Sequence, residues 1–398
     1  MTYVDRSIFS VFQEATRAFA VVMLTGPRQS GKTTFLRQQI MPEGYKLLSL
    51  DEPATRNFAK EDPVGFIERN PPPVILDEIQ YAAEVLPVIK NRVDENRKPG
   101  QWILTGSQQF QMMRNITESL AGRGAILSLL PFSLSEAQKV HSELASSAWI
   151  FAGGYPEVVI GRASRKNLWM NSYLQTYLER DVRNLRQVGD LHQFELFLRA
   201  LAARSAQILN YSDISRDIGI SVPTAKQWVS ILESSYTIFT LPPYFRNVGK
   251  RLIKAPKMYF LDTGLMSALL GYRSGAEILS GPLAGPFFET GVVAELIKLF
   301  HHAGMRPPIY YWRTRDGHEV DVLIESNGSI LPIEIKSTAT PTAVHLKSMN
   351  LLRRLMPDAG KTALLICRVK EETPMAHDSL ALPWNRIEHY LRQHDMFV

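Results

Sequence analysis

The sequence predicts an α/β fold in which a parallel sheet carries a phosphate-binding loop, with a helical lid and two further domains after it. The first observation is the segment 26–33, GPRQSGKT, which fits the pattern G-x-x-x-x-G-K-S/T. The second is its setting, because an apolar run at 19–24 precedes it and a helical pattern at 34–39 follows it. The third is the alternation of apolar runs with helical patterns up to residue 130, which is typical of a parallel sheet.

The strand, the glycine-bearing loop and the start of the helix together predict a phosphate site. In such a loop the backbone N–H groups point at the anion, the lysine reaches the β- and γ-phosphates, and the hydroxyl of the last residue ligates Mg²⁺. Here these residues are Lys32 and Thr33. The sequence therefore predicts binding of ATP with Mg²⁺ by Gly26, Pro27, Arg28, Gln29, Ser30, Gly31, Lys32, Thr33 and Thr34.

Four more apolar runs, at 45–51, 74–78, 101–107 and 125–130, predict the rest of the sheet. Ligands of such sheets lie at the carboxyl ends of the strands. The run at 74–78 ends in Asp77 and Glu78, so we expect Asp77 to hold Mg²⁺ and Glu78 to orient the attacking water. Ser107, or Thr105 as the less favoured choice, either hydrogen-bonds that water or the γ-phosphate or simply caps a strand end.

Composition sets outer limits on the kind of protein. The length of 398 residues indicates two to four domains, and 45% hydrophobic residues suffice for real cores. The single cysteine, Cys367, lies in an apolar run, which excludes disulfides and cysteine-based zinc sites. The first residues lack the layout of a signal peptide and no run of eighteen apolar residues occurs, so we expect a cytosolic protein without a membrane span.

The net charge of +6 is unevenly distributed. Residues 160–260 contain fifteen Lys/Arg and seven Asp/Glu, a local +8, so the rest of the chain carries +6 minus +8, or −2. A basic middle third indicates a polyanionic partner, and nucleic acid, DNA in particular, is the expected one.

Helical patterns at 133–140, 147–151 and 166–185 predict the lid. Residues 211–219 and 224–233 then predict two helices joined by a turn at 220–223, and strand-like runs follow at 236–240 and 257–261. This order predicts a helix-turn-helix with a wing. Its connection is basic, and the expected phosphate contacts are Arg246, Lys250, Arg251 and Lys254. A winged helix can equally be a packing module, so both roles stay open.

The last part of the chain predicts a second α/β domain. A helix at 287–300 bears Glu289, and strands follow at 309–313, 319–325 and 330–336. If the last two strands are neighbours, Asp321 and the Glu334-x-Lys336 sequence converge with Glu289 on a possible Mg²⁺ site. This arrangement resembles the core of restriction-endonuclease-like, or PD-(D/E)xK, nucleases. The same pattern also fits a half-exposed strand whose acids face water.

Several motifs together resemble the AAA-type (AAA+) P-loop ATPases of bacteria and archaea, specifically those fused to an uncharacterised C-terminal domain. The resemblance covers nearly the whole chain and is implied by the phosphate loop, LDEIQ at 76–80, LTGS at 104–107, SLAGR at 119–123, LLPF at 129–132, GGYP at 153–156, YLERDV at 177–182 and FETG at 288–291. It implies ATP hydrolysis and assembly into a ring, with a hexamer expected. It also implies that Arg123 is an arginine finger acting on a neighbouring subunit, although Arg114 is a rival and Arg123 could instead cap a helix or pair with a surface acid.

The expected domains are therefore an ATPase core at 1–132, a lid at 133–205, a winged helix at 206–282 and a nuclease-like domain at 283–398. The leading hypothesis is an Mg²⁺-dependent ring ATPase that acts as a motor on nucleic acid, for instance on branched DNA. An ATP-gated nuclease using the C-terminal acids is the second hypothesis. A nucleotide switch that recruits proteins and never contacts DNA is the third.

Overall fold

The computed structural model describes residues 3–106, 122–162, 166–177, 190–245, 254–326, 328–356, 359–360 and 362–397. The chain packs as two compact units. The first contains the residues up to Val140 together with the short segments 234–236 and 301–305, and the second contains the remaining described residues. In the parts that the structure describes, none of the helices has the length and apolarity that a membrane span requires.

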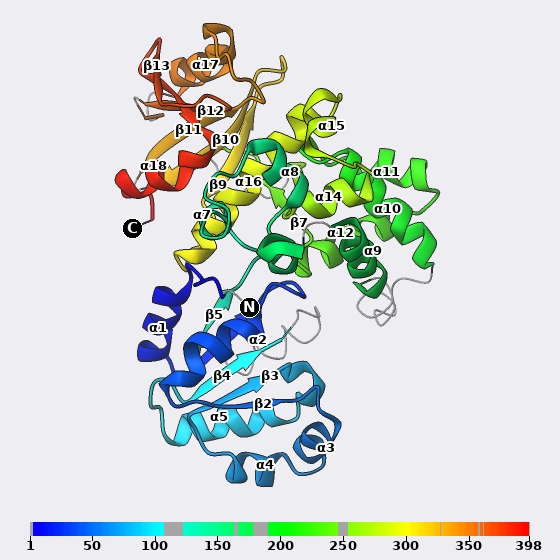
Figure 1. Cartoon of the computed structure of the whole chain (residues 1–398), viewed down its shortest axis with the longest axis vertical. Helices are drawn as coiled ribbons and strands as arrows, with labels where there is room; N and C mark the ends of the chain where they lie inside the picture. Colours follow the sequence, from blue (N-terminus) through cyan, green and yellow to red (C-terminus); the bar gives the residue numbers. More distant parts are fainter. Residues whose placement is uncertain are drawn as a thin grey trace. The chain divides into compact units, whose positions relative to one another are not determined.

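A five-stranded sheet forms the centre of the first unit (Figure 1), with the strand order β2-β3-β4-β1-β5 and every neighbouring pair parallel. The five predicted strands are confirmed, with ends shifted by at most two residues. They are β1 (Val21–Thr25), β2 (Lys46–Ser49), β3 (Val74–Asp77), β4 (Trp102–Thr105) and β5 (Gly124–Ser128).

Alternate side chains of these strands fill two cores, one on each face of the sheet. On β1, Met23 belongs to the core beneath α3, α4 and α5, whereas Val22 and Leu24 belong to the core beneath α1 and α2. Burying one such side chain contributes about 1.5–3 kcal/mol to folding. The helices and helical turns of this unit are α1 (Phe9–Ala18), α2 (Lys32–Phe35) with a π-helical continuation (Leu36–Ile40) and a 3-10 turn (Met41–Glu43), α3 (Pro53–Glu61), α4 (Pro63–Arg69), a 3-10 turn (Ile79–Ala82), α5 (Val85–Glu95) and α7 (Leu134–Gln138).

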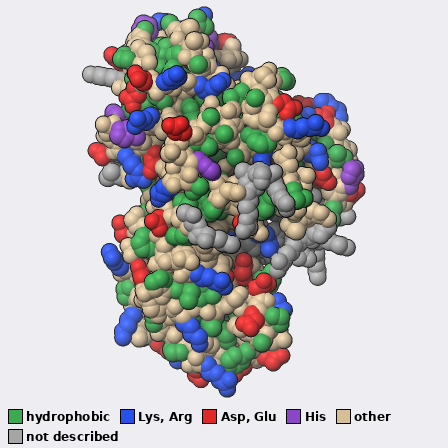
Figure 2. Space-filling view, in the orientation of Figure 1, with side chains coloured by type: hydrophobic (Ala, Val, Ile, Leu, Met, Phe, Trp, Pro, Cys, Tyr) green, Lys and Arg blue, Asp and Glu red, His purple; other side chains and the backbone are tan. Residues whose placement is uncertain are grey.

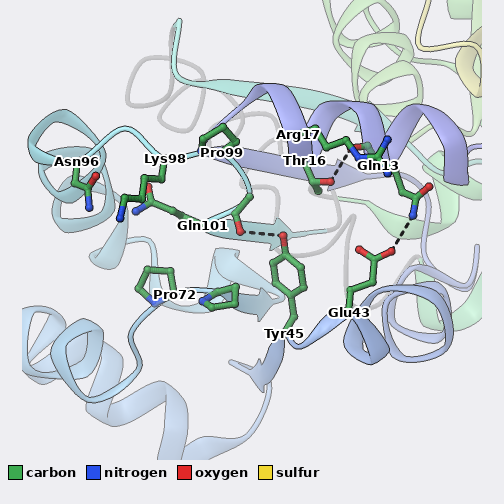
Figure 3. A pocket seen from close by; sticks show the side chains of 12 residues that line it. Gln13, Thr16, Arg17, Glu43, Tyr45, Pro72, Asn96, Lys98, Pro99 and Gln101 are labelled. Atoms are coloured by element: carbon green, nitrogen blue, oxygen red, sulfur yellow. Dashed lines mark hydrogen bonds between the residues drawn. The ribbon is translucent and has the colours of Figure 1, made fainter.

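A polar cavity of about 770 Å³ lies at the amino ends of the strands of this sheet (Figure 3). Across it, the Tyr45 hydroxyl donates to the Gly100 carbonyl at 2.9 Å, and Gln13 donates to Glu43 at 2.8 Å. Because ligands of parallel sheets bind at the carboxyl ends, this cavity is at the wrong end for the predicted nucleotide site.

The second unit begins with helices α8 (Ser146–Ala152), a π-helical turn (Val158–Arg162), α9 (Lys166–Tyr177) and α10 (Leu191–Ala203). The predicted pair of helices follows as α11 (Tyr211–Ile218) and α12 (Val222–Ser234). The helix α12 starts earlier than expected because Pro223, predicted to lie in the turn, fits the first turn of a helix. A three-stranded antiparallel sheet, β6-β8-β7, completes this part with β6 (Gln207–Ile208), β7 (Ile238–Leu241) and β8 (Lys257–Phe260), and α14 (Thr263–Leu269) and α15 (Gly275–Ser280) follow.

The C-terminal part of the second unit is a six-stranded mixed sheet of order β13-β14-β12-β11-β10-β9. The predicted helix and three strands are confirmed as α16 (Ala284–His302), β9 (Ile309–Arg313), β10 (Glu319–Ser326) and β11 (Ser329–Ile335), and β10 is antiparallel to both neighbours. The elements after these were not predicted from the sequence. They are a 3-10 turn (Ala343–Leu346), α17 (Lys347–Leu355), β12 (Ala363–Cys367), β13 (Thr373–Met375), β14 (Ser379–Pro383), a 3-10 turn (Trp384–Arg386) and α18 (Ile387–Gln393).

A buried ion pair fixes the end of the first unit. Arg6 donates to Glu136 at 3.1 Å, and the Ser7 N–H donates to the same carboxylate at 2.6 Å. Burial alone would raise the pKa of Glu136, but Arg6, His302 and the Ser7 N–H outweigh it and lower the pKa to about 2. The folded state therefore holds this proton more weakly than the unfolded chain does, so the stability from Glu136 is present above pH 4.5 and is lost as the pH falls toward 2.

We predict that Glu136→Gln destabilises the first unit by about 3 kcal/mol, because removing one partner leaves the Arg6 guanidinium buried without a counter-charge. The variant should also lose the part of the acid-induced destabilisation that wild type shows between pH 4.5 and 2. Chemical denaturation across this pH range measures both effects. The exposed Glu14→Gln on α1 of the same unit is the matched control, and equal stability of the two variants would contradict the prediction.

Candidate functional site

The phosphate-binding loop connects the end of β1 to the first residue of α2. Gly26 has φ +138°, and a Cβ atom there would lie 2.2 Å from the Leu129 carbonyl oxygen, so no other residue fits. Gly31 has φ +93° and immediately precedes α2. The two glycines thus allow the tight turn that aims the loop backbone along the carboxyl edge of the sheet.

Lys32 and Thr33 lie where the sequence predicted. Lys32 Nζ donates to the carbonyls of Gly26 and Pro27 at 3.0 and 2.8 Å, which holds the ammonium over the loop. Thr33 Oγ1 donates to Asp77 Oδ2 at 2.9 Å. The loop and the end of β3 therefore present a hydroxyl and a carboxylate at one point, and Mg²⁺ prefers oxygen ligands of this kind.

The carboxyl ends of β3 and β4 are joined by Thr105. Its hydroxyl donates to Asp77, and it accepts a hydrogen bond from the Glu78 N–H at 3.1 Å. Glu78 has φ +58°, a left-handed conformation that is uncommon outside glycine, and its carboxylate accepts from Gln80. Thr105, the less favoured sequence candidate, thus organises the two acids, whereas Ser107 lies outside the described residues.

Arg6 supports the loop from beneath, and the sequence analysis missed it. Besides Glu136, its guanidinium donates to the Ser30 carbonyl of the loop at 2.8 Å and to the Leu130 carbonyl at 2.6 Å. All these groups are buried. No local pattern marks an isolated arginine near the start of a chain as a partner of a loop 24 residues away.

Arg123 lies just before β5, at the amino ends of the strands, whereas the phosphate loop of the same chain lies at their carboxyl ends. Its guanidinium donates to both carboxylate oxygens of Asp94, at 2.5 and 2.9 Å. The hydrogen bond from Arg123 lowers the pKa of Asp94. Arg123 is therefore paired within the chain, as the alternative interpretation allowed. Its rival Arg114 lies outside the described residues.

The four residues predicted to converge in the C-terminal domain do lie together. Lys336 Nζ lies 2.6 Å from Glu334 and 3.3 Å from Asp321, and the Tyr259 hydroxyl donates to Glu289 at 2.7 Å. Glu319, which the sequence analysis did not single out, joins them. We call Glu289, Glu319, Asp321 and Glu334 the carboxylate cluster.

A second lysine, Lys257 of β8, lies within the carboxylate cluster. Its Nζ is 2.9 Å from Glu289, 2.5 Å from Glu319 and 3.8 Å from Asp321, and its side chain is only 4% exposed. Burial alone would lower the pKa of Lys257, but the three carboxylates outweigh it and raise the pKa. The ammonium therefore stays charged and supplies, among these acids, the positive charge that a metal ion would supply.

The negative charges of Glu289 and Glu334 are only partly compensated by the two lysines. Burial and the neighbouring Asp321 raise the pKa of Glu289 to about 7 and that of Glu334 to about 8. Within the described residues, no group of three or more His, Cys, Asp or Glu side chains is arranged to hold a metal ion. The cluster thus differs from the Mg²⁺ site that the sequence suggested, because the ammonium group of Lys257 lies among its carboxylates. Lys257 was not expected there because its strand, β8, is far from the acids in the sequence.

Three family models match consecutive parts of the chain. An AAA domain matches residues 18–138, the domain of unknown function DUF8612 matches 145–275, and the domain of unknown function DUF4143 matches 284–387. The uncharacterized protein Rv2008c of Mycobacterium tuberculosis is 31% identical over 329 residues, which are 81% of this chain and 71% of that protein. The chain belongs to the AAA-type P-loop ATPases with a C-terminal DUF4143 domain.

Other relatives of this AAA-type ATPase are more distant. An uncharacterized protein of Haemophilus influenzae is 24% identical over 314 residues, 75% of this chain and 73% of that protein. The Walker-type ATPase PABY2304 of Pyrococcus abyssi has a TM-score of 0.44 at 16% identity, covering 67% of this chain and 96% of that one. The RuvB Holliday junction branch migration motor of Thermotoga maritima has 0.32 at 17%, covering 60% and 90%.

We predict that the wild-type protein binds no Mn²⁺ at the carboxylate cluster, whereas the Lys257→Ala variant does. Removing the ammonium leaves Glu289, Glu319 and Asp321 facing one another without a counter-charge, and a divalent cation relieves that repulsion. Calorimetric titration with Mn²⁺ in the absence of nucleotide gives the difference between the two proteins.

The exposed lysine Lys370→Ala is the matched control and should titrate like wild type. Adding Asp321→Asn to Lys257→Ala should abolish the new Mn²⁺ binding. Mn²⁺ binding by wild type that Asp321→Asn removes would show instead that the cluster is a metal site despite Lys257.

Proposed function

We propose that the chain is an Mg²⁺-dependent ATP hydrolase that works as a ring-shaped motor on nucleic acid. The hydrolase part rests on one observation above all, the 2.9 Å contact between Thr33 of the loop and Asp77 of β3, beside Lys32. The two oxygens fit Mg²⁺, and Mg²⁺ bound there with ATP would neutralise charge on the phosphates. The chain's own groups then bind the phosphates through the loop N–H groups and Lys32.

In this proposal Glu78 orients the water that attacks the γ-phosphate. Its backbone is held by Thr105, and Gln80 donates to its carboxylate, so the side chain has a defined position at the carboxyl edge of the sheet. Positioning and electrostatic stabilisation supply most of the catalysis in phosphoryl transfer. Ser107 remains a proposed partner of the same water.

The ring is proposed from the position of Arg123. Arg123 lies at the amino ends of the strands, whereas nucleotide bound to its own chain would lie at the carboxyl ends. An arginine-finger role for Arg123 therefore requires the nucleotide of a neighbouring subunit. Its bond to Asp94 would then have to be exchanged for the neighbour's γ-phosphate. As in the sequence analysis, the proposed ring is a hexamer.

The nucleic-acid part is proposed from the charge of residues 160–260, which include the proposed phosphate contacts Arg246, Lys250, Arg251 and Lys254. Of these, only Lys254 is among the described residues, and it is exposed. On the face shown in Figure 2, the basic and acidic side chains of the described residues are interspersed, and these residues form no broad basic field there. Helix-helix-strand-strand order in 211–260 supports a winged helix as the module concerned.

The competing hypotheses make different demands. An ATP-gated PD-(D/E)xK nuclease needs a metal at Glu289, Asp321 and Glu334 beside Lys336, and the position of Lys257 weighs against it. A protein-recruiting switch needs no nucleic acid. The deciding experiment is the ATPase rate measured without nucleic acid and with single-stranded, duplex and four-way-junction DNA, where stimulation supports the motor and its absence supports the switch.

We predict that Lys32→Ala abolishes tight ATP binding, whereas Glu78→Gln keeps binding and slows hydrolysis by about 10²–10⁴-fold. The reason is that Lys32 meets the phosphates in the ground state, while Glu78 acts on the water during the reaction. Equilibrium binding of a fluorescent ATP analogue and phosphate release separate the two effects. A Glu78→Gln protein that hydrolyses ATP at the wild-type rate would remove Glu78 from the mechanism.

We predict that Arg123→Ala lowers ATP turnover by about 10³-fold or more with ATP affinity retained, as expected of an arginine finger. Mixing it with Glu78→Gln subunits should restore part of the activity, because each protein supplies the half-site that the other lacks. Phosphate release from the mixtures is the measurement.

Asp94→Ala is the control that separates the two roles of Arg123. If Arg123 only pairs with Asp94, losing either partner should have the same effect. If Arg123 acts on a neighbour, Asp94→Ala should hydrolyse ATP at least as fast as wild type. No recovery in the mixtures would argue against a site shared between subunits.

A further inference from the structure

A cavity of about 610 Å³ in the second unit lies outside both sites described above. We call it the basic groove, and it is lined by Ile208, Pro243, Tyr244, Phe245, Lys254, Ala255, Tyr311, Arg313, Thr314 and Arg315. Three of these residues are basic and none is acidic. Pockets of about 300–1,000 Å³ enclose small ligands, so the groove has room for a nucleotide of a single strand but not for a duplex.

The floor of the basic groove is held by backbone pairing. The Tyr244 N–H donates to the Tyr311 carbonyl at 2.6 Å, and the Tyr311 N–H donates to the Pro242 carbonyl at 3.0 Å, so residues 242–244 extend the sheet beyond its edge strand β9. The Tyr311 hydroxyl donates to the Ala255 carbonyl at 2.7 Å, which connects the two walls. The groove is therefore formed before any ligand arrives, and binding in it costs little ordering.

Charge and aromatic residues lie on different parts of the groove. Lys254, Arg313 and Arg315 are exposed, whereas Tyr244 and Tyr311 are buried in the floor and Phe245 is half-buried. Two acids lie near these cations, because Arg313 also donates to Glu319 at 3.4 Å and Asp316 follows Arg315 in the chain, but neither acid lines the groove. Exposed cations above an aromatic floor are the combination that binds the phosphates and unpaired bases of a single strand.

We propose that the basic groove binds single-stranded nucleic acid, with phosphates on Lys254, Arg313 and Arg315 and a base against Phe245. The proposal rests on the proposed function in that it names where the nucleic acid lies. It shares Lys254 with the proposed winged-helix contacts, but it adds Arg313, the last residue of β9, and Arg315, both of which lie outside residues 160–260. A strand in this groove would run beside the carboxylate cluster, since Arg313 contacts Glu319.

The first test measures the binding of a fluorescein-labelled oligothymidylate to the full chain by anisotropy over a range of salt concentrations. Arg313→Ala with Arg315→Ala should weaken binding by on the order of tenfold near physiological salt. The log–log salt slope should flatten by about 1.4, or about 0.7 for each phosphate that is no longer neutralised. Lys347→Ala with Arg354→Ala, an exposed basic pair on α17 of the same unit, should bind like wild type.

The second test separates stacking from charge. Phe245→Leu should weaken binding without changing the salt slope, because a base stacked on a ring releases no counterions. Phe245→Tyr, which keeps an aromatic ring, should bind with the wild-type affinity. Thermal unfolding of each variant shows that it is folded. Repeating the titration with a labelled oligouridylate distinguishes RNA from DNA. A labelled duplex should bind more weakly than either single strand.

The outcomes are distinct. If wild type binds no nucleic acid, both the proposed function and the groove fail. If wild type binds but the groove variants bind equally well, or the α17 control is weakened to the same extent, the groove alone fails. If polyglutamate competes as well as the oligonucleotide at equal charge, the groove recognises acidic polymers in general and the proposal is overturned.

Discussion

The carboxylate of Asp77 is the point on which the geometry of the nucleotide site depends. It accepts hydrogen bonds from Thr33 at the start of α2 and from Thr105 at the end of β4, and Thr105 in turn accepts from the backbone of Glu78. Hydrogen bonds to an ionised group are about twice as strong as neutral ones. One buried charge thus sets the relative positions of the loop, two strand ends and the second acid, and a change at any of the three hydroxyl or carboxylate groups moves the others.

Much of the first unit could be predicted from sequence because its signals are local. Apolar runs of five to seven residues predicted all five strands, and the glycines and Lys32 identified the loop without knowledge of the fold. The same holds for α11, α12, α16 and the strands β9 to β11. The positions of Asp77 and Glu78 followed from a general rule, since strands of a parallel sheet bring their carboxyl ends to one edge.

The residues that could not be predicted are those whose partners are distant in sequence. Arg6 and Glu136 are separated by 130 residues, and neither has a neighbour that marks it as half of a buried pair. Lys257 was counted with the basic residues of the middle third, yet it is buried among carboxylates, as Lys166 is buried beside Ser267. Two of the fifteen positive charges in that region therefore offer nothing to a polyanion, which a count of residue types cannot detect.

The left-handed backbone of Glu78 has a consequence for how this protein balances folding against turnover. A non-glycine residue held in that conformation costs about 1–3 kcal/mol, and glycine would avoid most of the cost. Selection for thermal stability alone would therefore place glycine at position 78. A carboxylate there implies that the chain gives up stability at the edge proposed to be catalytic, so the tolerance of this unit to further destabilising substitutions is smaller than its well-filled cores suggest.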